Sequence, residues 1–258
     1  MKNYFDENCI NYDRLRPDYP DALFNYGLYQ CGRAPETALE VGCGTGKATV
    51  GFLKRGIRVD ALEPGENLAG FAERRFKGFL DKFRIFHTSF EDFESREKYD
   101  LLFSATAFHW VCQKTGYKKA YDFLCHGGAV VLFWSVPRIS DKNMALKKEI
   151  QGVYEKFYPS TREAEMPRGF RYGYVLDNLE KAGFSKVSAK KFFCIREFSA
   201  EDYRDLLTTY SDHMALERDR REMLMSGVQK AVQRYGKVTI DYTFEMYTGI
   251  KEDKGDSL

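Results

Sequence analysis

The chain has 258 residues, of which 43% are hydrophobic and 30% are charged. This length and composition suit one α/β domain, or a domain with an insertion, and exclude a disordered chain. The formal net charge of +2 argues against a dedicated nucleic-acid-binding protein, because such proteins usually carry a basic face. No apolar run approaches the ~18 residues of a membrane span and no secretory signal is visible, so we expect a cytoplasmic protein that does not enter a membrane.

Six cysteines are scattered along the chain without a C-x-x-C pair or a histidine at zinc spacing. They are Cys9, Cys31, Cys43, Cys112, Cys125 and Cys194. We therefore expect free thiols in a reducing compartment and no bound metal.

The N-terminal segment at residues 12–20 contains two tyrosines, two arginines and two prolines. Pro17 and Pro20 interrupt the pattern, so we do not predict a smooth helix here. A helix is predicted to begin at Pro20 or Asp21 and to continue to Leu28.

Residues 38–51 are typical of a short buried strand, a tight turn and the start of a helix. Leu39 and Val41 are apolar and favour a parallel strand. Gly42, Gly44 and Gly46 follow at every second position, and glycine permits positive φ angles and close approach of a ligand. The next helix offers unpaired N–H groups at its start, so the turn suits the polar end of a ligand.

The spacing of these glycines separates the ligands that such turns bind. A dinucleotide fold requires G-x-G-x-x-G, whereas this turn reads G-x-G-x-G. A phosphate-binding P-loop requires a glycine at the position of Val41 and a hydroxyl after Lys47, where Ala48 stands. Neither phosphate motif is therefore present.

A second strand is predicted at residues 59–62, and Glu63 ends it about 20 residues after the glycines. A carboxylate in this position can accept hydrogen bonds from both hydroxyls of a ribose. Pro64 cannot continue a strand ladder, so it ends the strand and places the acid at the sheet edge. The sequence therefore predicts a nucleoside site.

Helices and strands alternate up to residue 134, which is typical of a doubly wound parallel sheet. Further helices are predicted at residues 47–56, 66–78 and 114–124, the last ended by the glycines at 127 and 128, and further strands at residues 83–87, 99–105 and 129–134. Beyond residue 136 we predict helices at residues 144–157, 176–182 and 214–235, and a further helix that follows a capping box at residues 199–202. Strands are predicted there at residues 187–196 and 238–249.

The fourth strand leads into Ala105, Phe108, His109 and Trp110 at its carboxyl end, where open α/β sheets bind ligands. His109 has two interpretations. It could act as a general base near neutral pH, or it could pack and hydrogen-bond the loop.

These motifs resemble those of a known family. The pattern E-x-G-x-G-x-G at residues 40–46 is similar to the first motif of class I S-adenosylmethionine-dependent methyltransferases. The pattern A-x-A-F-H-W at residues 105–110 and the segment at residues 12–20 resemble the trans-aconitate methyltransferase group, in which that segment is a lid over the cofactor. The other interpretation of residues 12–20 is a plain N-terminal wrap.

The resemblance implies an α/β fold with a doubly wound, mostly parallel, Rossmann-like sheet of seven strands, of which the last is antiparallel and inserts beside the sixth. It implies one methyltransferase domain at residues 1–258. Residues 1–33 would form the lid or wrap, residues 34–136 the cofactor-binding core, and residues 137–258 the acceptor-pocket helices and the last two strands.

The resemblance also implies transfer of a methyl group from S-adenosylmethionine to a small molecule, which leaves S-adenosylhomocysteine. Glu40 would lie near the α-ammonium group, and Ser89 stands where the family places an acid near the adenine, so Ser89 or Glu91 would replace that acid. The expected cofactor-binding residues are Tyr12, Arg16, Tyr19, Glu40, Gly42, Cys43, Gly44, Thr45, Gly46, Glu63, Pro64, Ser89, Phe90, Glu91, Ala105, Phe108 and Trp110.

The trans-aconitate group acts on carboxylates, which need no base because they are ionised at neutral pH. Arginine forks position carboxylates, and the expected acceptor-binding residues are Arg138, Arg168, Arg171 and Tyr172. The other interpretation of these arginines is a set of solvated loop residues. Three alternatives remain: a nicotinamide-dependent oxidoreductase, a non-catalytic nucleoside-cofactor-binding protein, and a protein or RNA methyltransferase. We expect a monomer or weak homodimer.

Overall fold

The computed structural model describes residues 8–79, 81–158 and 171–252, which divide into two compact units. The sheet unit consists of the described residues within 18–135, 172–192 and 244–252. The helix unit consists of the described residues within 8–17, 136–171 and 193–243. Strands β5, β6 and β7 contribute residues to both units.

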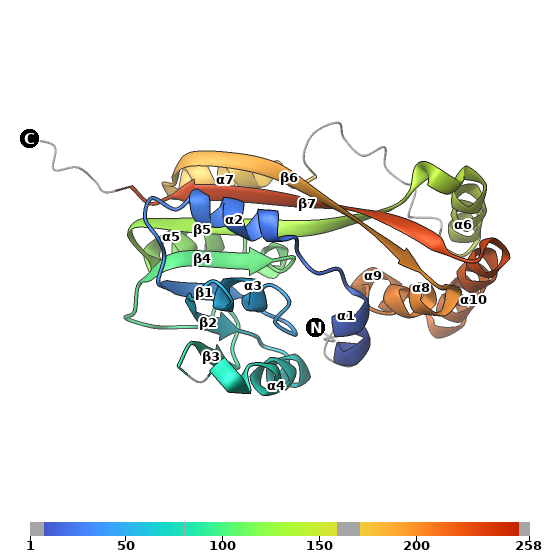
Figure 1. Ribbon diagram of the computed structural model, residues 1–258, viewed down its shortest axis with the longest axis horizontal. Coiled ribbons are helices and arrows are strands. Elements are labelled where there is room, and N and C mark those ends of the chain that lie inside the picture. Colours follow the sequence, from blue (N-terminus) through green and yellow to red (C-terminus); the bar gives the residue numbers. More distant parts are fainter. Residues whose placement is uncertain (1–7, 80, 159–170, 253–258) are drawn as a thin grey trace, which may run out of the picture. The chain divides into compact units, whose positions relative to one another are not determined.

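A seven-stranded sheet has the order β3-β2-β1-β4-β5-β7-β6 (Figure 1). β1 pairs in parallel with β2 and β4, β2 pairs with β3, and β4 pairs with β5. The chain therefore reverses its direction of winding beside β1, and open sheets of this kind bind ligands at the carboxyl ends of the strands there. The strands are β1 Thr37–Val41, β2 Arg58–Leu62, β3 Phe83–Phe86, β4 Tyr99–Ala105, β5 Leu124–Ile139, β6 Ser185–Phe198 and β7 Val238–Ile250.

β7 lies between β5 and β6 and runs antiparallel to β5. Lys251 N donates to Gly128 O over 2.8 Å, and Ser140 N donates to Thr239 O over 2.9 Å. The partner's number falls as the number in β5 rises, which is the mark of an antiparallel pair. The predicted sheet of seven strands with an inserted last strand is confirmed.

Helices cover both faces of the sheet in the sheet unit. In Figure 1, α2 and α3 lie in front of the sheet, and α5 and α7 lie behind it. Gly51 of α3 allows the close approach of α2, because a Cβ there would lie 2.2 Å from the ring of Phe24. These helices are α2 Asp21–Tyr29, α3 Thr49–Leu53, α4 Glu66–Arg75, α5 Gly116–Phe123 and α7 Tyr174–Ala182, with short 3-10 turns η2 Lys77–Phe79 and η3 Phe108–Trp110.

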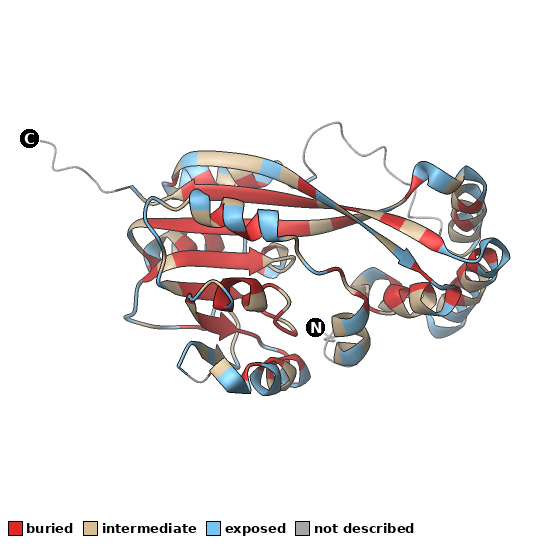
Figure 2. Ribbon diagram, in the orientation of Figure 1, coloured by how far each residue is buried: buried red, intermediate tan, exposed pale blue. Residues whose placement is uncertain are grey.

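The core of the sheet unit follows the central strands, which are buried along most of their length (Figure 2). Leu101, Leu102 and Phe103 of β4 have no exposed surface, nor do the neighbouring residues of β5 from Ala129 to Phe133. Strands buried on both faces have continuous apolar sequences, which is why β5 was readable from its sequence.

The helix unit contains α1 Cys9–Leu15, η4 Asp141–Asn143, α6 Met144–Phe157, α8 Ala200–Leu207, α9 Ser211–Met214 and α10 Arg218–Tyr235. α6 packs on α10, where a Cβ at Gly227 would lie 2.7 Å from a methyl group of Val153. Ser199 Oγ accepts a hydrogen bond from Asp202 N over 3.1 Å at the start of α8, which confirms the predicted N-cap.

The prediction that residues 12–20 do not form a smooth helix is confirmed, whereas one prediction about the glycines was wrong. Residues 9–15 form α1, which ends before Pro17 because proline restricts the residue before it: Arg16 takes an extended backbone with ψ of 144°. Gly127 and Gly128 do not end α5, which ends at Phe123. They lie in β5, where the register with β4 shifts and a Cβ at Gly128 would lie 2.9 Å from Cys125 O.

The helix predicted at residues 214–235 is confirmed as α10 Arg218–Tyr235 but begins four residues later, because a break separates it from α9. α9 ends at Met214, whose carbonyl oxygen accepts from Arg221 Nη1 over 3.2 Å. Glu217 then takes an extended backbone with ψ of 142° before α10 begins. The side-chain bond to the carbonyl group substitutes for the helical bond that the break removes.

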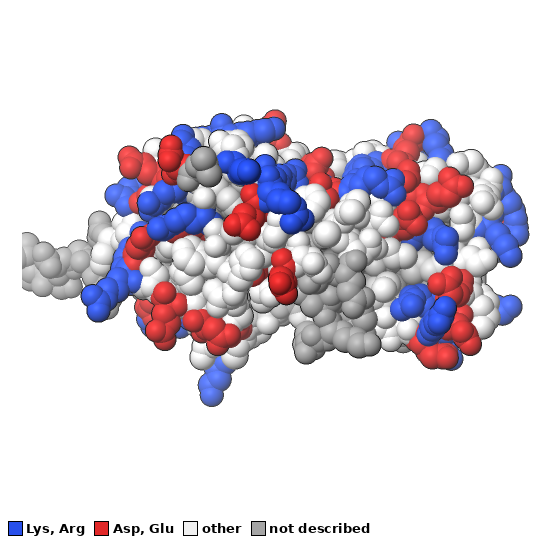
Figure 3. Space-filling view, turned by 90° about the horizontal axis from the view of Figure 1, so that it is seen from below, with Lys and Arg blue, Asp and Glu red and all other residues white. Residues whose placement is uncertain are grey.

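No helix in the three described ranges has both the length and the apolar character that crossing a membrane requires. Basic and acidic side chains are interspersed on the face shown in Figure 3.

Candidate cofactor and acceptor site

The turn after β1 is built from three glycines with positive φ angles, 71° at Gly42, 57° at Gly44 and 84° at Gly46. Side chains would not fit at two of them. A Cβ at Gly42 would lie 2.6 Å from the Cβ of Ala107, and a Cβ at Gly46 would lie 2.2 Å from the ring of Phe76. The turn is therefore packed against the loop after β4 and the residue that follows α4, and glycine at these positions permits the positive φ angles.

Glu40, near the end of β1, is fully buried. Its Oε2 accepts a hydrogen bond from Thr49 Oγ1 over 2.5 Å, whereas its Oε1 has no hydrogen-bond partner among the described residues. Burial raises the pKa of Glu40 to about 8, with a further contribution from the charge of Glu63. The buried Oγ1 of Thr45 is likewise without a partner in the described part of the chain.

Two unsatisfied oxygens beside one glycine turn are unusual, because buried polar groups are nearly always hydrogen-bonded. An ammonium group provides donors for Glu40 Oε1 and stabilises the ionised carboxylate. The two oxygens at this turn therefore fit the amino-acid end of S-adenosylmethionine. The turn lacks the adjacent lysine and hydroxyl residue with which a P-loop binds phosphate.

Glu63 joins the glycine turn to the loop after β2. Its Oε2 accepts from Gly44 N over 2.8 Å, and its Oε1 accepts from Gly65 N over 2.9 Å, with Pro64 exposed between them. A carboxylate is an acceptor, and these two bonds orient the side chain between the two loops.

Both residues expected near the adenine have partners within the protein. Ser89 Oγ donates to Asp92 Oδ2 over 2.7 Å and accepts from Asp92 N over 3.1 Å. Glu91 Oε1 accepts from Cys112 N over 2.7 Å, which ties the loop after β3 to the loop after β4. Phe90 is buried, so its ring belongs to the core of the sheet unit.

Thr106, the first residue after β4, has a φ of 57°, which is strained for a β-branched residue. Its Oγ1 accepts from Ser135 N over 3.2 Å and lies 3.3 Å from the hydroxyl oxygen of Tyr19. Backbone strain of this kind is concentrated at functional sites. Thr106 was not predictable from the sequence, because glycine, asparagine and aspartate are the residues that indicate such a backbone.

The three side chains of the 3-10 turn η3 differ in how far they are exposed. Phe108 is fully buried and contacts Tyr117 with a ring separation of 5.1 Å, whereas Trp110 is 52% exposed. His109 lies between these extremes, and its Nδ1 accepts a hydrogen bond from Trp134 Nε1 over 3.0 Å.

The segment expected to form a lid is divided between the two units. In the sheet unit, Asp18 forms an ion pair of 2.7 Å with Lys47, the residue after the glycine turn. In the helix unit, Arg16 Nε donates to Thr209 Oγ1 over 2.9 Å, and its guanidinium lies 3.9 Å from the centre of the Tyr210 ring and 5.2 Å from that of Tyr12. The role of this segment as a lid stays a prediction.

The expected acceptor-binding residues are also divided. Arg138 and Arg171 are exposed and belong to the helix unit. Tyr172 belongs to the sheet unit, where its ring stacks on that of Trp134 at 4.7 Å and 21°. Arg168 lies outside the described residues.

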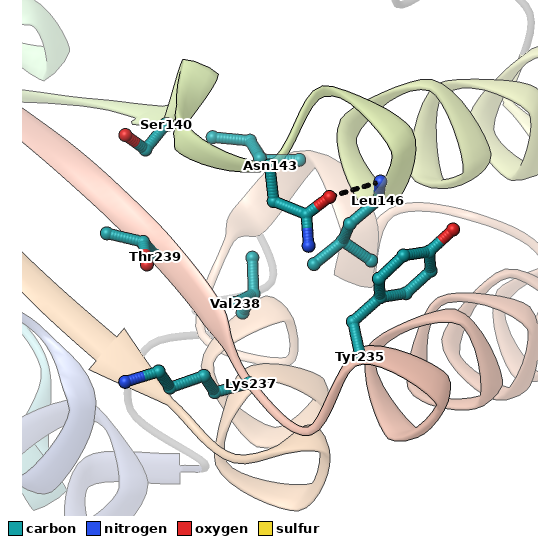
Figure 4. A pocket seen from close by; sticks show the side chains of 8 residues that line it. Ser140, Asn143, Leu146, Tyr235, Lys237, Val238 and Thr239 are labelled. Atoms are coloured by element: carbon teal, nitrogen blue, oxygen red, sulfur yellow. Dashed lines mark hydrogen bonds between the residues drawn. The ribbon is translucent and has the colours of Figure 1, made fainter.

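A separate pocket of about 140 Å³ lies in the helix unit (Figure 4). Its polar lining is already used: Asn143 Oδ1 accepts from Leu146 N over 3.0 Å at the start of α6, and Lys237 pairs with Glu197 over 2.7 Å. Neither of these two side chains is a buried group without a partner, as Glu40 Oε1 is among the described residues.

Comparisons with known proteins show similarity to methyltransferases. A family model described as a methyltransferase domain matches residues 38–128, which include the glycine turn, Glu63 and β4. Over 246 residues, the chain is 22% identical to an uncharacterized methyltransferase from Schizosaccharomyces pombe, and the match covers 89% of this chain and 87% of that relative.

Two solved structures show the same fold. One is a protein from Anaeromyxobacter dehalogenans assigned as a type II methyltransferase, with a TM-score of 0.64, 20% identity, and coverage of 92% of this chain and 98% of that chain. The other is a phosphoethanolamine N-methyltransferase from Haemonchus contortus in complex with phosphomonomethylethanolamine and S-adenosylhomocysteine. It has a TM-score of 0.57 and 14% identity, and the match covers 98% of this chain and 58% of that chain.

Proposed function

The chain is a class I S-adenosylmethionine-dependent methyltransferase, and we propose that it transfers the methyl group to a carboxylate on a small molecule. The narrower resemblance to the trans-aconitate methyltransferase group stays a prediction. The proposal concerns the acceptor and the residues that serve it.

The residues at the ends of β1 and β2 support a specific binding mode for the cofactor. In this proposal Glu40 and Thr45 hold the amino-acid end, since each has a buried oxygen without a partner in the described residues. Glu63 holds the ribose, and the glycine turn provides close backbone contact. The bound sulfonium supplies a methyl carbon that is already activated, so the protein has to align the acceptor and exclude water.

A carboxylate acceptor fits this chemistry because it is ionised at neutral pH and needs no base. One acceptor oxygen forms a bond to the methyl carbon as the sulfur–carbon bond breaks, S-adenosylhomocysteine leaves, and no proton moves. The observation that supports the proposal is the exposure of Arg138 and of Arg171, because guanidinium groups bind carboxylates with two parallel hydrogen bonds.

The test uses S-adenosylmethionine with a labelled methyl group and matched panels of small carboxylic acids, amines and phenols. We expect label in the methyl ester of a carboxylic acid, which releases labelled methanol in mild base, because methyl esters hydrolyse and N-methyl groups do not. Arg138→Gln or Arg171→Gln should raise the KM for the acid about tenfold or more, with S-adenosylhomocysteine affinity unchanged.

Arg220→Gln provides the matched control, since Arg220 is another exposed arginine of the helix unit and lies in α10. Its KM should equal that of the wild type. Labelled amine or phenol products that resist base would contradict the carboxylate proposal, and unchanged KM values in both arginine variants would remove the arginines from it.

A further inference from the structure

His109 is held by aromatic side chains from several elements of the sheet unit. Trp134 of β5, which is 1% exposed, donates its Nε1–H to His109 Nδ1. The ring of Trp110 lies 4.9 Å from the imidazole, and that of Tyr172 lies 6.5 Å away. These contacts fix both the position and the plane of the imidazole.

The bond from Trp134 also determines which nitrogen carries the proton. An indole Nε1–H can only donate, so the Nδ1 that faces it must present a lone pair. In a neutral imidazole with an unprotonated Nδ1, the proton is on Nε2. Adding a second proton at Nδ1 would place two N–H groups against each other and break the bond.

We infer that Trp134 fixes His109 as the neutral tautomer with its proton on Nε2, so that His109 presents a hydrogen-bond donor and does not act as the base of the methyl transfer. Trp134 is then a positioning residue. The inference rests on the proposed function and deepens it, because an acceptor at this site must arrive already ionised, as a carboxylate does.

A stacked ring and a chain of hydrogen bonds hold the indole of Trp134 in place. Tyr172 stacks on the indole, and its backbone N–H donates to Glu245 Oε2 over 3.3 Å and to the hydroxyl oxygen of Tyr247 over 3.2 Å. Tyr247 also donates to Glu245 Oε2 over 2.8 Å, and the fully buried Glu245 forms an ion pair of 3.6 Å with Lys191.

The ionisable groups that contact Trp134 and Tyr172, two of the residues packed against His109, do not supply a base in its place. Burial, together with the neighbouring Glu245, raises the pKa of Tyr247, and burial raises the pKa of Tyr174. Both phenols therefore stay protonated near neutral pH. Glu245 is occupied by Tyr172, Tyr247 and Lys191.

The tautomer can be measured without an acceptor, by long-range ¹H–¹⁵N correlation spectra of the full chain labelled at its four histidines. The His109 signals are identified by their loss in His109→Phe. We expect an unprotonated Nδ1 and a protonated Nε2 at every pH from 6 to 9. A protonated Nδ1, or a ring that becomes doubly protonated within this range, would overturn the inference.

The two tryptophans of the chain provide a matched pair of variants. Trp134→Phe should release His109, so that both tautomers appear and the ring titrates, whereas Trp110→Phe should keep the Nε2–H tautomer. If Trp134→Phe does not fold, the Trp134 Nε1–H of the wild type should exchange with solvent at least tenfold more slowly than in His109→Phe, and equal rates would overturn the inference.

These outcomes are separate from the acceptor assay. A fixed Nε2–H tautomer in an enzyme that methylates only amines would refute the carboxylate proposal and leave the role of Trp134 intact. A carboxylate methyltransferase whose His109 titrates freely would support the carboxylate proposal and refute the role of Trp134.

Discussion

At the scale of single residues, Glu40 is the group whose chemistry depends most on its surroundings. Burial raises its pKa to about 8, so the carboxyl is mostly protonated at pH 7 in the cofactor-free protein. An ammonium group at Oε1 favours the ionised form. Binding of S-adenosylhomocysteine should therefore release up to one proton, and affinity should rise with pH until about pH 8. Calorimetry in two buffers of different ionisation enthalpy measures the released proton.

Glu40→Gln is the control for this proton release. The glutamine cannot ionise, so the variant should bind more weakly and show the same enthalpy in both buffers. Stability should also change: the folded chain keeps a proton at Glu40 that the unfolded chain loses above its ordinary pKa of 4.5. Wild-type stability should therefore fall as pH rises from 4.5 toward about 8, and the glutamine variant should lack this contribution. Identical pH dependence in both proteins would contradict the assignment.

Single residues also show where sequence reasoning reached its limit at the site. Glu40 and Glu63 were predictable because their positions relative to the glycines are fixed by strand ends. The strained backbone of Thr106 was not, since threonine is not a residue that indicates a positive φ angle. Nor could the sequence choose between the two interpretations of His109, because the hydrogen bond from Trp134 joins residues 25 positions apart.

At the scale of elements, local patterns identified most helices and strands but not their exact ends. The capped α8 and the parallel strands were predictable from hydrophobic periodicity and turn residues. The extension of β5 to Ile139 and the glycine irregularity within it were not, because pairing with neighbouring strands decides them. The helix α1 was not predicted, although the interruption before Pro17 was, where Arg16 takes an extended backbone.

Two helical glycines in the helix unit provide a matched test of element packing. Gly152 in α6 faces open space, whereas a Cβ at Gly227 in α10 would meet Val153 of α6, whose branched side chain is stiff in a helix. Gly152→Ala should stabilise the chain by roughly 0.5–1 kcal/mol through helix propensity. Gly227→Ala should destabilise it by roughly 1–3 kcal/mol through overpacking. Chemical denaturation measures both, and equal effects would contradict the α6–α10 packing.

At the scale of the whole molecule, each of the two units is assembled from segments that are distant in sequence. The sheet unit carries the glycine turn, Glu63 and the His109 turn, whereas Arg138 and Arg171 belong to the helix unit. Sequence motifs could not predict this division, because each unit takes three separate stretches of the chain.

The central claim is that the carboxyl ends of β1 and β2 bind S-adenosylmethionine, and calorimetric titration with S-adenosylhomocysteine tests it most directly. We predict that the wild type binds this ligand and not NADH, and that Gly44→Val remains folded and does not bind. Glu63→Ala should weaken binding by roughly 1.5–3 kcal/mol, the range for hydrogen bonds to a charged group, while the exposed-site control Glu73→Ala binds normally. Binding of NADH, or normal affinity in Gly44→Val, would contradict the account.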